Sequence, residues 1–146
     1  MFYLLIIIME KERAKLKGFN NYKVSKDWVV EAWEQEVIRK GTKWNYKRPA
    51  HTVKASLDKG TWYTRIYMKR DTGKRHNLLI HRVVYCAFNG LEYTDDKLIV
   101  CHIDDDRTNN HLDNLYGWTQ KDNMSDIQLK NRLLGLYKQG KIIIKD

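Results

Sequence analysis

The sequence has little cysteine, little proline and no apolar run long enough to cross a bilayer. One proline and eight glycines among 146 residues argue against a disordered or low-complexity chain. The two cysteines, Cys86 and Cys101, are too few for a disulfide framework and indicate reduced thiols in a cytosol-like compartment. The apolar run at residues 1–9 lacks the basic start and cleavage site of a signal peptide, so we expect a buried or edge strand there. Met9 is an alternative start.

Length and composition limit the organisation of the chain. A chain of 146 residues fits one compact domain, or one small domain with short appendages, and excludes a large multi-domain enzyme. With 42% apolar and 12% aromatic residues, the chain is expected to fold.

The charge balance favours a polyanionic partner. Lys and Arg number 27 against 18 Asp and Glu, which gives a net charge of +9 and a pI near 9.5. Basic residues alternate with Trp and Tyr over residues 39–75, which favours nucleic acid over an anionic membrane surface. The tryptophans are expected to be mostly core, with Trp44 and Trp62 as the best candidates for lying against DNA. The candidate DNA-binding residues are Arg39, Lys43, Trp44, Lys47, Arg48, Trp62, Arg65, Lys69, Arg70 and Arg107.

Local patterns predict an α+β fold. Residues 10–17 fit a short helix or a loop. Over residues 22–38, Val30, Trp33 and Val37 have helical spacing, although strands are the alternative. Residues 52–69 alternate around a turn at residues 58–60 and, with a second turn at residues 71–74, predict a β-meander. Residues 78–88 predict a largely buried helix that ends at Asn89 and Gly90.

The most informative segment is residues 97–131. Residues 97–103 predict a strand, residues 104–114 a polar loop, and residues 115–118 a return strand. From Thr119 onward the pattern is helical, and Thr119 with Asp122 resembles a capping box.

This segment contains the groups that hydrolysis of a phosphodiester requires. His102 ends the first strand, where an imidazole with a pKa near 6.5 can accept a proton at neutral pH. Across the loop, the amide of Asn114 can hold either the imidazole or the loop backbone. Asn123 lies where its side-chain oxygen can reach a divalent cation.

Three stretches carry a family resemblance: NYKVS at 21–25, HRVVYCAF at 81–88, and CHIDDDRTNNHLDNLYGWTQKDN at 101–123. They resemble the phage and intron-type HNH homing endonucleases. The resemblance implies a ββα-metal nuclease core preceded by a small β-rich DNA-binding region. It also implies that His102 is the general base, Asn114 the middle Asn of the motif, and Asn123 a metal ligand.

Two positions depart from the family pattern. Cys101 stands where the family has a metal ligand, and its sulfur favours Zn²⁺ or another soft ion over the expected Mg²⁺ or Mn²⁺. A carboxylate of Asp104, Asp105 or Asp106 can compensate. Asp105 also replaces a loop glycine, which Asp tolerates because it adopts left-handed backbone angles more easily than most residues.

The resemblance leads to an expected organisation and partner. We expect an appendage at 1–19, a DNA-binding module at 20–75, the nuclease core at 76–132, and a helix end with a strand at 133–146. The expected partner is double-stranded DNA, nicked by a monomer or cut on both strands by a homodimer. The expected location is the cytoplasm, that of the host cell if a phage encodes the protein.

Alternatives accompany these expectations. His81 and Cys86 are expected to be core residues, and His111 a solvated loop residue. A catalytically inactive HNH-fold protein that binds DNA is the second hypothesis, because of Cys101. A structural zinc site that uses Cys101, Cys86 and a histidine is the third, although the paired CxxC ligands of convincing sites are missing.

Overall fold

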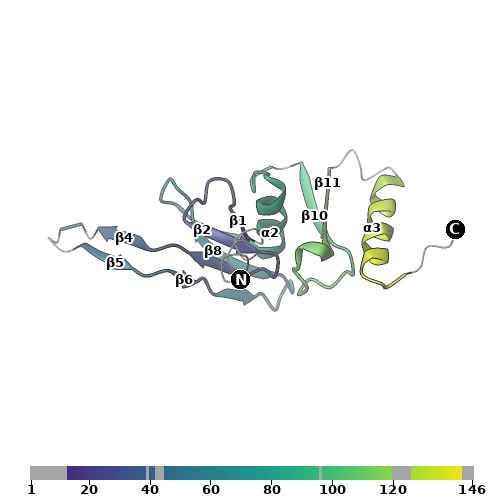
Figure 1. Ribbon diagram of the computed structural model, residues 1–146, viewed down its shortest axis with the longest axis horizontal. Helices are drawn as coiled ribbons and strands as arrows, with labels where there is room; N and C mark the ends of the chain where they lie inside the picture. Colours follow the sequence, from purple (N-terminus) through teal and green to yellow (C-terminus); the bar gives the residue numbers. More distant parts are fainter. Residues whose placement is uncertain (1–12, 39, 42–44, 96, 120–125, 143–146) are drawn as a thin grey trace, which may run out of the picture.

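The computed structural model describes residues 13–38, 40–41, 45–95, 97–119 and 126–142, and they form a mixed α+β fold (Figure 1). In chain order the elements are β1 (Arg13–Ala14), β2 (Tyr22–Ser25), β3 (Val30–Ala32), β4 (Gln35–Ile38), β5 (Asn45–Arg48), β6 (His51–Thr52), β7 (Ala55–Leu57), β8 (Thr64–Lys69), β9 (Arg75–Leu79), α2 (Ile80–Asn89), β10 (Leu98–His102), the 3₁₀ turn η1 (Leu112–Asn114), β11 (Leu115–Thr119) and α3 (Asp126–Lys138). No helix in these ranges is both long and apolar enough to cross a membrane.

Of the two alternatives for residues 22–38, the helix is wrong and the strands are confirmed, since this segment forms β2, β3 and β4. Burial in β2 and β3 alternates with period two, which is the pattern of strands with one face in the core. Between these strands Trp28 has a φ of 57°, and the Ser25 hydroxyl accepts a hydrogen bond from the amide of Val29 at 3.1 Å. This tight turn is incompatible with a continuous helix and reverses the direction of the chain between β2 and β3. Residues 13 and 14 pair with β2 as strand β1 rather than forming the short helix.

The N-terminal strands form three antiparallel sheets. Strands β1, β2, β3 and β6 form one sheet, and β7, β8 and β9 form the predicted meander. The β4–β5 hairpin extends away from the body, at the end of the molecule opposite α3 (Figure 1).

Helix α2 connects the two halves of the fold. Its buried side chains, among them Ile80, Val83 and Val84, join one core cluster with Val24 of β2 and Ile66 of β8. The same cluster includes residues of β10 and β11. The helix ends where predicted, at Gly90, whose φ of 64° suits glycine. The module at 20–75 and the nuclease core at 76–132 thus share one apolar core, and the boundary between them stays a prediction.

The β10–β11 hairpin lies between α2 and α3 (Figure 1). This confirms the predicted order of strand, polar loop and return strand. Gly117 of β11 lies against the ring of Tyr85 on α2, where a Cβ atom would be 2.5 Å from a ring carbon. On the other side, Gly135 of α3 lies against Ile103. The predicted capping box includes Asp122, which lies outside the described residues.

The tryptophans are less buried than expected. Trp118 is buried, and Trp28 packs against the core cluster. Trp33 is 41% exposed, so the expectation of a core residue is wrong for Trp33. The Trp33 ring instead lies beneath the Lys23 ammonium, which is 4.0 Å from the ring centroid. Trp62 is 57% exposed, and Trp44 lies outside the described residues.

Candidate active site

His102 is the last residue of β10 and faces α2. Because β10 alternates between its two faces, His102 points to the same side as Leu98 and Val100, and its side chain is buried. Its ring centroid lies 4.7 Å from that of His81 on α2 and 6.3 Å from that of Tyr63. The candidate base therefore packs beside the rings of His81 and Tyr63.

Asn110 fixes the orientation of the His102 ring. Its Oδ1 lies 2.9 Å from Nε2 of His102, and its Nδ2 donates to the carbonyl of Thr108 at 3.3 Å. Since the second bond directs Oδ1 towards the imidazole, Nε2 of neutral His102 carries the hydrogen. Nδ1 then has the free lone pair and forms no hydrogen bond with the described residues. Asn110 is fully buried, and sequence reasoning assigned it no role.

Asn114 holds the loop backbone and makes no bond to His102. Its Oδ1 accepts from the amide of Asp104 at 3.2 Å, and its Nδ2 donates to the carbonyl of Asn109 at 2.8 Å. Gln139, just beyond α3, donates to the same Oδ1 at 3.1 Å. The structure therefore shows that the Asn114 amide holds the loop backbone and not the imidazole.

The three loop carboxylates have separate internal partners. Burial raises the pKa of Asp104, but hydrogen bonds from Asn109, Asn114 and a backbone amide outweigh it and lower the pKa to about 2. Asp105 has a φ of 61°, as expected at a loop glycine position, and pairs with Arg132 of α3. Asp106 accepts from the Thr108 amide at 2.9 Å.

Cys101 lies on the opposite face of the hairpin from His102. Its sulfur accepts a hydrogen bond from the indole Nε1 of Trp118, with 3.2 Å between the two atoms. Neighbouring strand residues point to opposite faces, so the described geometry does not bring the thiol and the imidazole together. The other predicted ligand, Asn123, lies outside the described residues.

His81 is a buried neutral base beside His102. Burial, and then the positive charges of His102 and Arg82, lower the pKa of His81 to about 3. Its Nδ1 is buried and has no hydrogen-bond partner among the described residues. His81 is thus a core histidine, as expected, and it also contacts the candidate base. Cys86 is likewise core, and burial raises the pKa of its thiol to about 11.

His111, expected to be a solvated loop residue, is half-buried instead. Its Nε2 lies 3.1 Å from Oδ1 of Asp27, and its Nδ1 accepts from the amide of Asp113 at 3.2 Å. The side chain therefore caps η1 and connects the loop at residues 103–111 to Asp27, which lies between β2 and β3.

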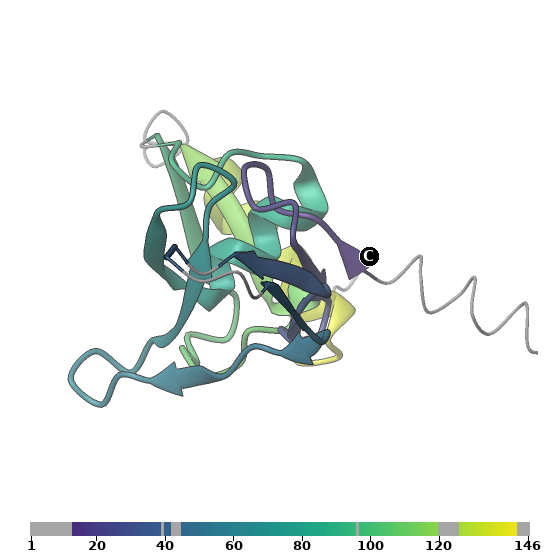
Figure 2. The same ribbon diagram turned by 90° about the vertical axis from the view of Figure 1, so that its left-hand side faces the viewer.

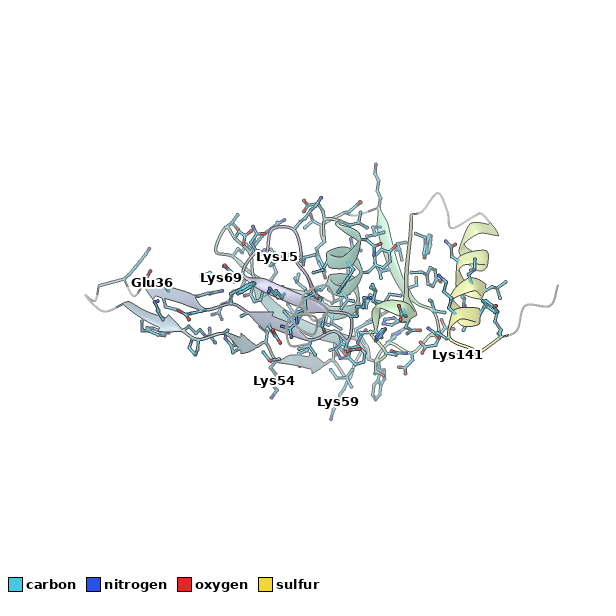
Figure 3. The ribbon with its side chains drawn as sticks, in the orientation of Figure 1. Lys15, Glu36, Lys54, Lys59, Lys69 and Lys141 are labelled. Atoms are coloured by element: carbon cyan, nitrogen blue, oxygen red, sulfur yellow. The ribbon has the colours of Figure 1, made fainter. Side chains whose placement is uncertain are left out.

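The predicted DNA-binding residues are spread over several strands and loops. Lys47 and Arg48 lie on the β4–β5 hairpin, and Lys69 ends β8 (Figure 3). Arg65 pairs with Asp58 at 3.4 Å. Arg39, Lys43 and Trp44 lie outside the described residues.

Two further predicted contacts are engaged within the chain. Arg70 lies over the ring of Phe19, with 5.8 Å between the guanidinium carbon and the ring centroid. Arg107 donates to the carbonyl of Thr61 at 2.8 Å and lies over the ring of Tyr63. Arg107 is thus connected to the candidate base through Tyr63, whose ring centroid lies 6.3 Å from that of His102.

Sequence reasoning missed the supporting residues Arg82 and Tyr63. Arg82 donates to the carbonyls of Tyr93 at 2.7 Å and Leu98 at 2.6 Å, and so fixes the start of β10. Its position after His81 in the helix motif was the available signal. Tyr63 had no signal, because only the folded chain brings it to His102.

Comparisons with known proteins find similarity to HNH endonucleases. Residues 78–125 match a family model described as HNH endonuclease. A solved structure that reports DNA binding and cleavage by the HNH homing endonuclease I-HmuI is similar, with 27% sequence identity and a TM-score of 0.53. The similarity covers 91% of this chain and 62% of that chain, so this chain spans less than two thirds of it. Curated proteins gave no match. Residues 78–125 are therefore similar to an HNH endonuclease domain.

Proposed function

We propose that the protein is a DNA endonuclease in which His102 activates the water that attacks a phosphodiester. The observation that carries the proposal is the bond between Nε2 of His102 and Oδ1 of Asn110, at 2.9 Å. A histidine whose Nε2–H is held by an amide oxygen has Nδ1 available as an acceptor, and such a base contributes about 10² to 10⁴ in rate.

The proposed reaction is a hydrolysis. Water oxygen bonds to phosphorus, one ester P–O bond breaks, and one proton of the water passes to Nδ1 of His102. The departing sugar oxygen takes a proton from solvent, so the products are a phosphate monoester and an alcohol. Asn110 keeps the ring from rotating, and Asn114 holds the loop that carries Asn110. Arg107, which donates to the Thr61 carbonyl and lies over the Tyr63 ring, is the cation that we propose for contacting the negative charge of the phosphate.

The described residues do not by themselves form a cation site. Among them, no group of three or more His, Cys, Asp or Glu side chains is placed to hold a metal ion. The sulfur of Cys101 already accepts the indole hydrogen of Trp118. HNH nucleases generally use a divalent ion, and we propose that Asn123 and the DNA phosphate supply ligands here.

The charge of the chain supports double-stranded DNA as the proposed substrate. The net charge is +9, and Lys47, Arg48 and Lys69 are exposed cations on the strands that precede the nuclease domain. We propose contacts from the predicted basic and aromatic residues, in a monomer that nicks or a homodimer that cuts both strands. The free thiols of Cys86 and Cys101 support a cytoplasmic location.

A plasmid nicking assay with Mg²⁺, Mn²⁺ or Zn²⁺ tests the proposal. His102→Ala should lower the cleavage rate by about 10² to 10⁴ while DNA affinity changes only a few fold. His51→Ala, which alters a histidine of β6 remote in sequence from the motif, is the matched control. Cleavage by His102→Ala at the wild-type rate would overturn the role of His102. DNA binding without cleavage by the wild-type protein would favour the inactive HNH-fold alternative, for which Cys101 is the motivation.

A further inference from the structure

The connection between β7 and β8 displays an aromatic ring in a strained backbone conformation. Trp62 has a φ of 61°, in the left-handed region that favours glycine, and its side chain is 57% exposed. More than half of this residue is exposed, so the packing of the indole compensates for that conformation only in part. Strained residues of this kind persist where the surroundings fix them, and they cluster at functional sites.

Asp58 fixes this connection from within. Its carboxylate accepts from the Gly60 amide at 3.0 Å and from the Thr61 hydroxyl at 2.9 Å, and these bonds lower the pKa of Asp58. The amide of Trp62 donates to the Asp58 carbonyl at 2.6 Å. The connection is therefore an ordered turn that includes Trp62. The segment between β7 and β8 lies at the lower left of Figure 2 (blue-green).

The same turn is attached to the candidate active site. Tyr63, next in the chain, stacks on His81 with 5.2 Å between ring centroids and lies 6.3 Å from His102. Arg107, in the loop at residues 103–111, donates to the Thr61 carbonyl, and its guanidinium carbon lies 4.7 Å from the Tyr63 ring centroid. The exposed indole thus lies one residue from the ring that covers the candidate base.

The surroundings of Trp62 suit a nucleic acid base. Lys59 on the same turn projects from the body of the molecule (Figure 3), and Arg107 is exposed beside it. An aromatic face among cations is the combination that stacks on bases while the cations contact phosphates. Apolar side chains inserted between base pairs also unstack and kink a duplex.

We propose that Trp62 stacks on a base of the DNA substrate next to the phosphate cleaved at His102. This inference rests on the proposed nuclease function. Tyr63, the neighbour of Trp62 in the chain, lies 6.3 Å from His102 between ring centroids, and for this reason we place the contacted base near the cut. Stacking at this position separates two neighbouring base pairs and brings the phosphate between them to His102.

Three variants separate stacking from folding. Trp62→Gly removes the ring and relieves the left-handed strain, so it should raise the melting temperature yet lower the nicking rate about 10-fold or more. Trp62→Phe keeps a ring in the same backbone and should nick within a few fold of wild type. Trp33→Ala, which removes the exposed tryptophan beside Lys23, is the control and should nick at the wild-type rate. A rate for Trp62→Gly equal to wild type would overturn the proposal.

A pre-opened substrate provides a test that a merely structural role would not pass. A duplex with an abasic site opposite the contacted base should restore nicking by Trp62→Gly, and should not restore nicking by His102→Ala. Failure of the abasic duplex to restore Trp62→Gly would count against stacking.

Binding without cleavage separates this inference from the proposed function. His102→Ala is mixed with duplexes carrying 2-aminopurine at successive positions, and one position should change fluorescence. Adding Trp62→Gly should abolish that change. Equal signals from the two proteins would overturn the stacking proposal even if the wild-type protein cuts DNA. A Trp62-dependent signal without any cleavage would support stacking while the nuclease proposal fails.

Discussion

The imidazole rings of His81 and His102 pack against each other, with 4.7 Å between their centroids. His81 comes from the first turn of α2 and His102 from the end of β10, so this contact joins the helix motif to the hairpin motif. His81 has a pKa near 3, which keeps it uncharged at neutral pH. It therefore packs beside the base without adding a second positive charge.

The low pKa of His81 predicts an acid-sensitive fold. Unfolded His81 has a pKa near 6.5 and binds a proton that the folded form excludes, so its contribution is complete above pH 6.5. It is lost as the pH falls from 6.5 towards 3, at about 1.4 kcal/mol per pH unit. Urea unfolding at several pH values measures this slope. His81→Phe keeps an aromatic ring but binds no proton, so the free energy of unfolding should depend less on pH, by about 1.4 kcal/mol per pH unit. An unchanged pH dependence would show that His81 is not the responsible group.

Asn110→Ala should slow cleavage more than it weakens DNA binding. Without Oδ1 the His102 ring can rotate, and its buried Nε2–H loses its partner. We expect a rate about 10- to 100-fold lower, less than the loss on removing the base itself, and a fold less stable by about 1 to 3 kcal/mol. Single-turnover nicking and urea unfolding measure the two effects. Asn89→Ala, which removes an exposed amide on α2, is the matched control, and equal rates for both variants would contradict a positioning role.

Gly117→Ala should destabilise the packing of α2 on the hairpin. The new methyl group would overlap the outer atoms of the Tyr85 ring, which must move. We expect a loss of about 1 to 3 kcal/mol in the free energy of unfolding. The double variant Gly117→Ala with Tyr85→Leu should lose less than the sum of the two single changes, because the clash is then absent. Additive losses would show that the two residues do not compete for space.

Cys101→Asp tests the metal preference. If the sulfur binds the cation, a carboxylate should raise activity with Mg²⁺ relative to Zn²⁺, because hard ions prefer oxygen. If Cys101 only accepts the bond from Trp118, as the 3.2 Å distance favours, the metal profile should stay unchanged. Nicking rates of both proteins with Mg²⁺, Mn²⁺ and Zn²⁺ distinguish the two accounts, and EDTA should stop cleavage in either.

DNA affinity should fall steeply with salt. Six phosphate contacts from the basic strands would give a slope of log K against log salt of about −5. Lys69→Gln should make this slope less negative by about 1. Lys138→Gln, on the last turn of α3, serves as the control and should not change it. A slope near zero for the wild-type protein would contradict DNA binding by this surface.

The nuclease motif could be found from the sequence because its signals are local. The strand with His102, the polar loop and the return strand follow one another, so alternation and turn residues identify them without distant contacts. The helix from Ile80 was also predicted, since it is apolar around most of its surface and ends at Gly90. The segment at 22–38 was mispredicted as a helix, because Val30, Trp33 and Val37 fit helical spacing while the turn at Trp28 carries no glycine to mark it.

The sequence by itself determined the candidate base, the basic character of the protein and the order of elements around His102, because composition and short-range periodicity depend on neighbours in the chain. Tertiary structure alone decided which amide holds that base, which face Cys101 occupies, and that Tyr63, the neighbour of Trp62 in the chain, lies beside His102. The physical reason is that these contacts join strands and loops far apart in the chain. Their pairing depends on one shared core, packed around α2, and on side-chain hydrogen bonds within a polar loop that leave no periodic trace in the sequence.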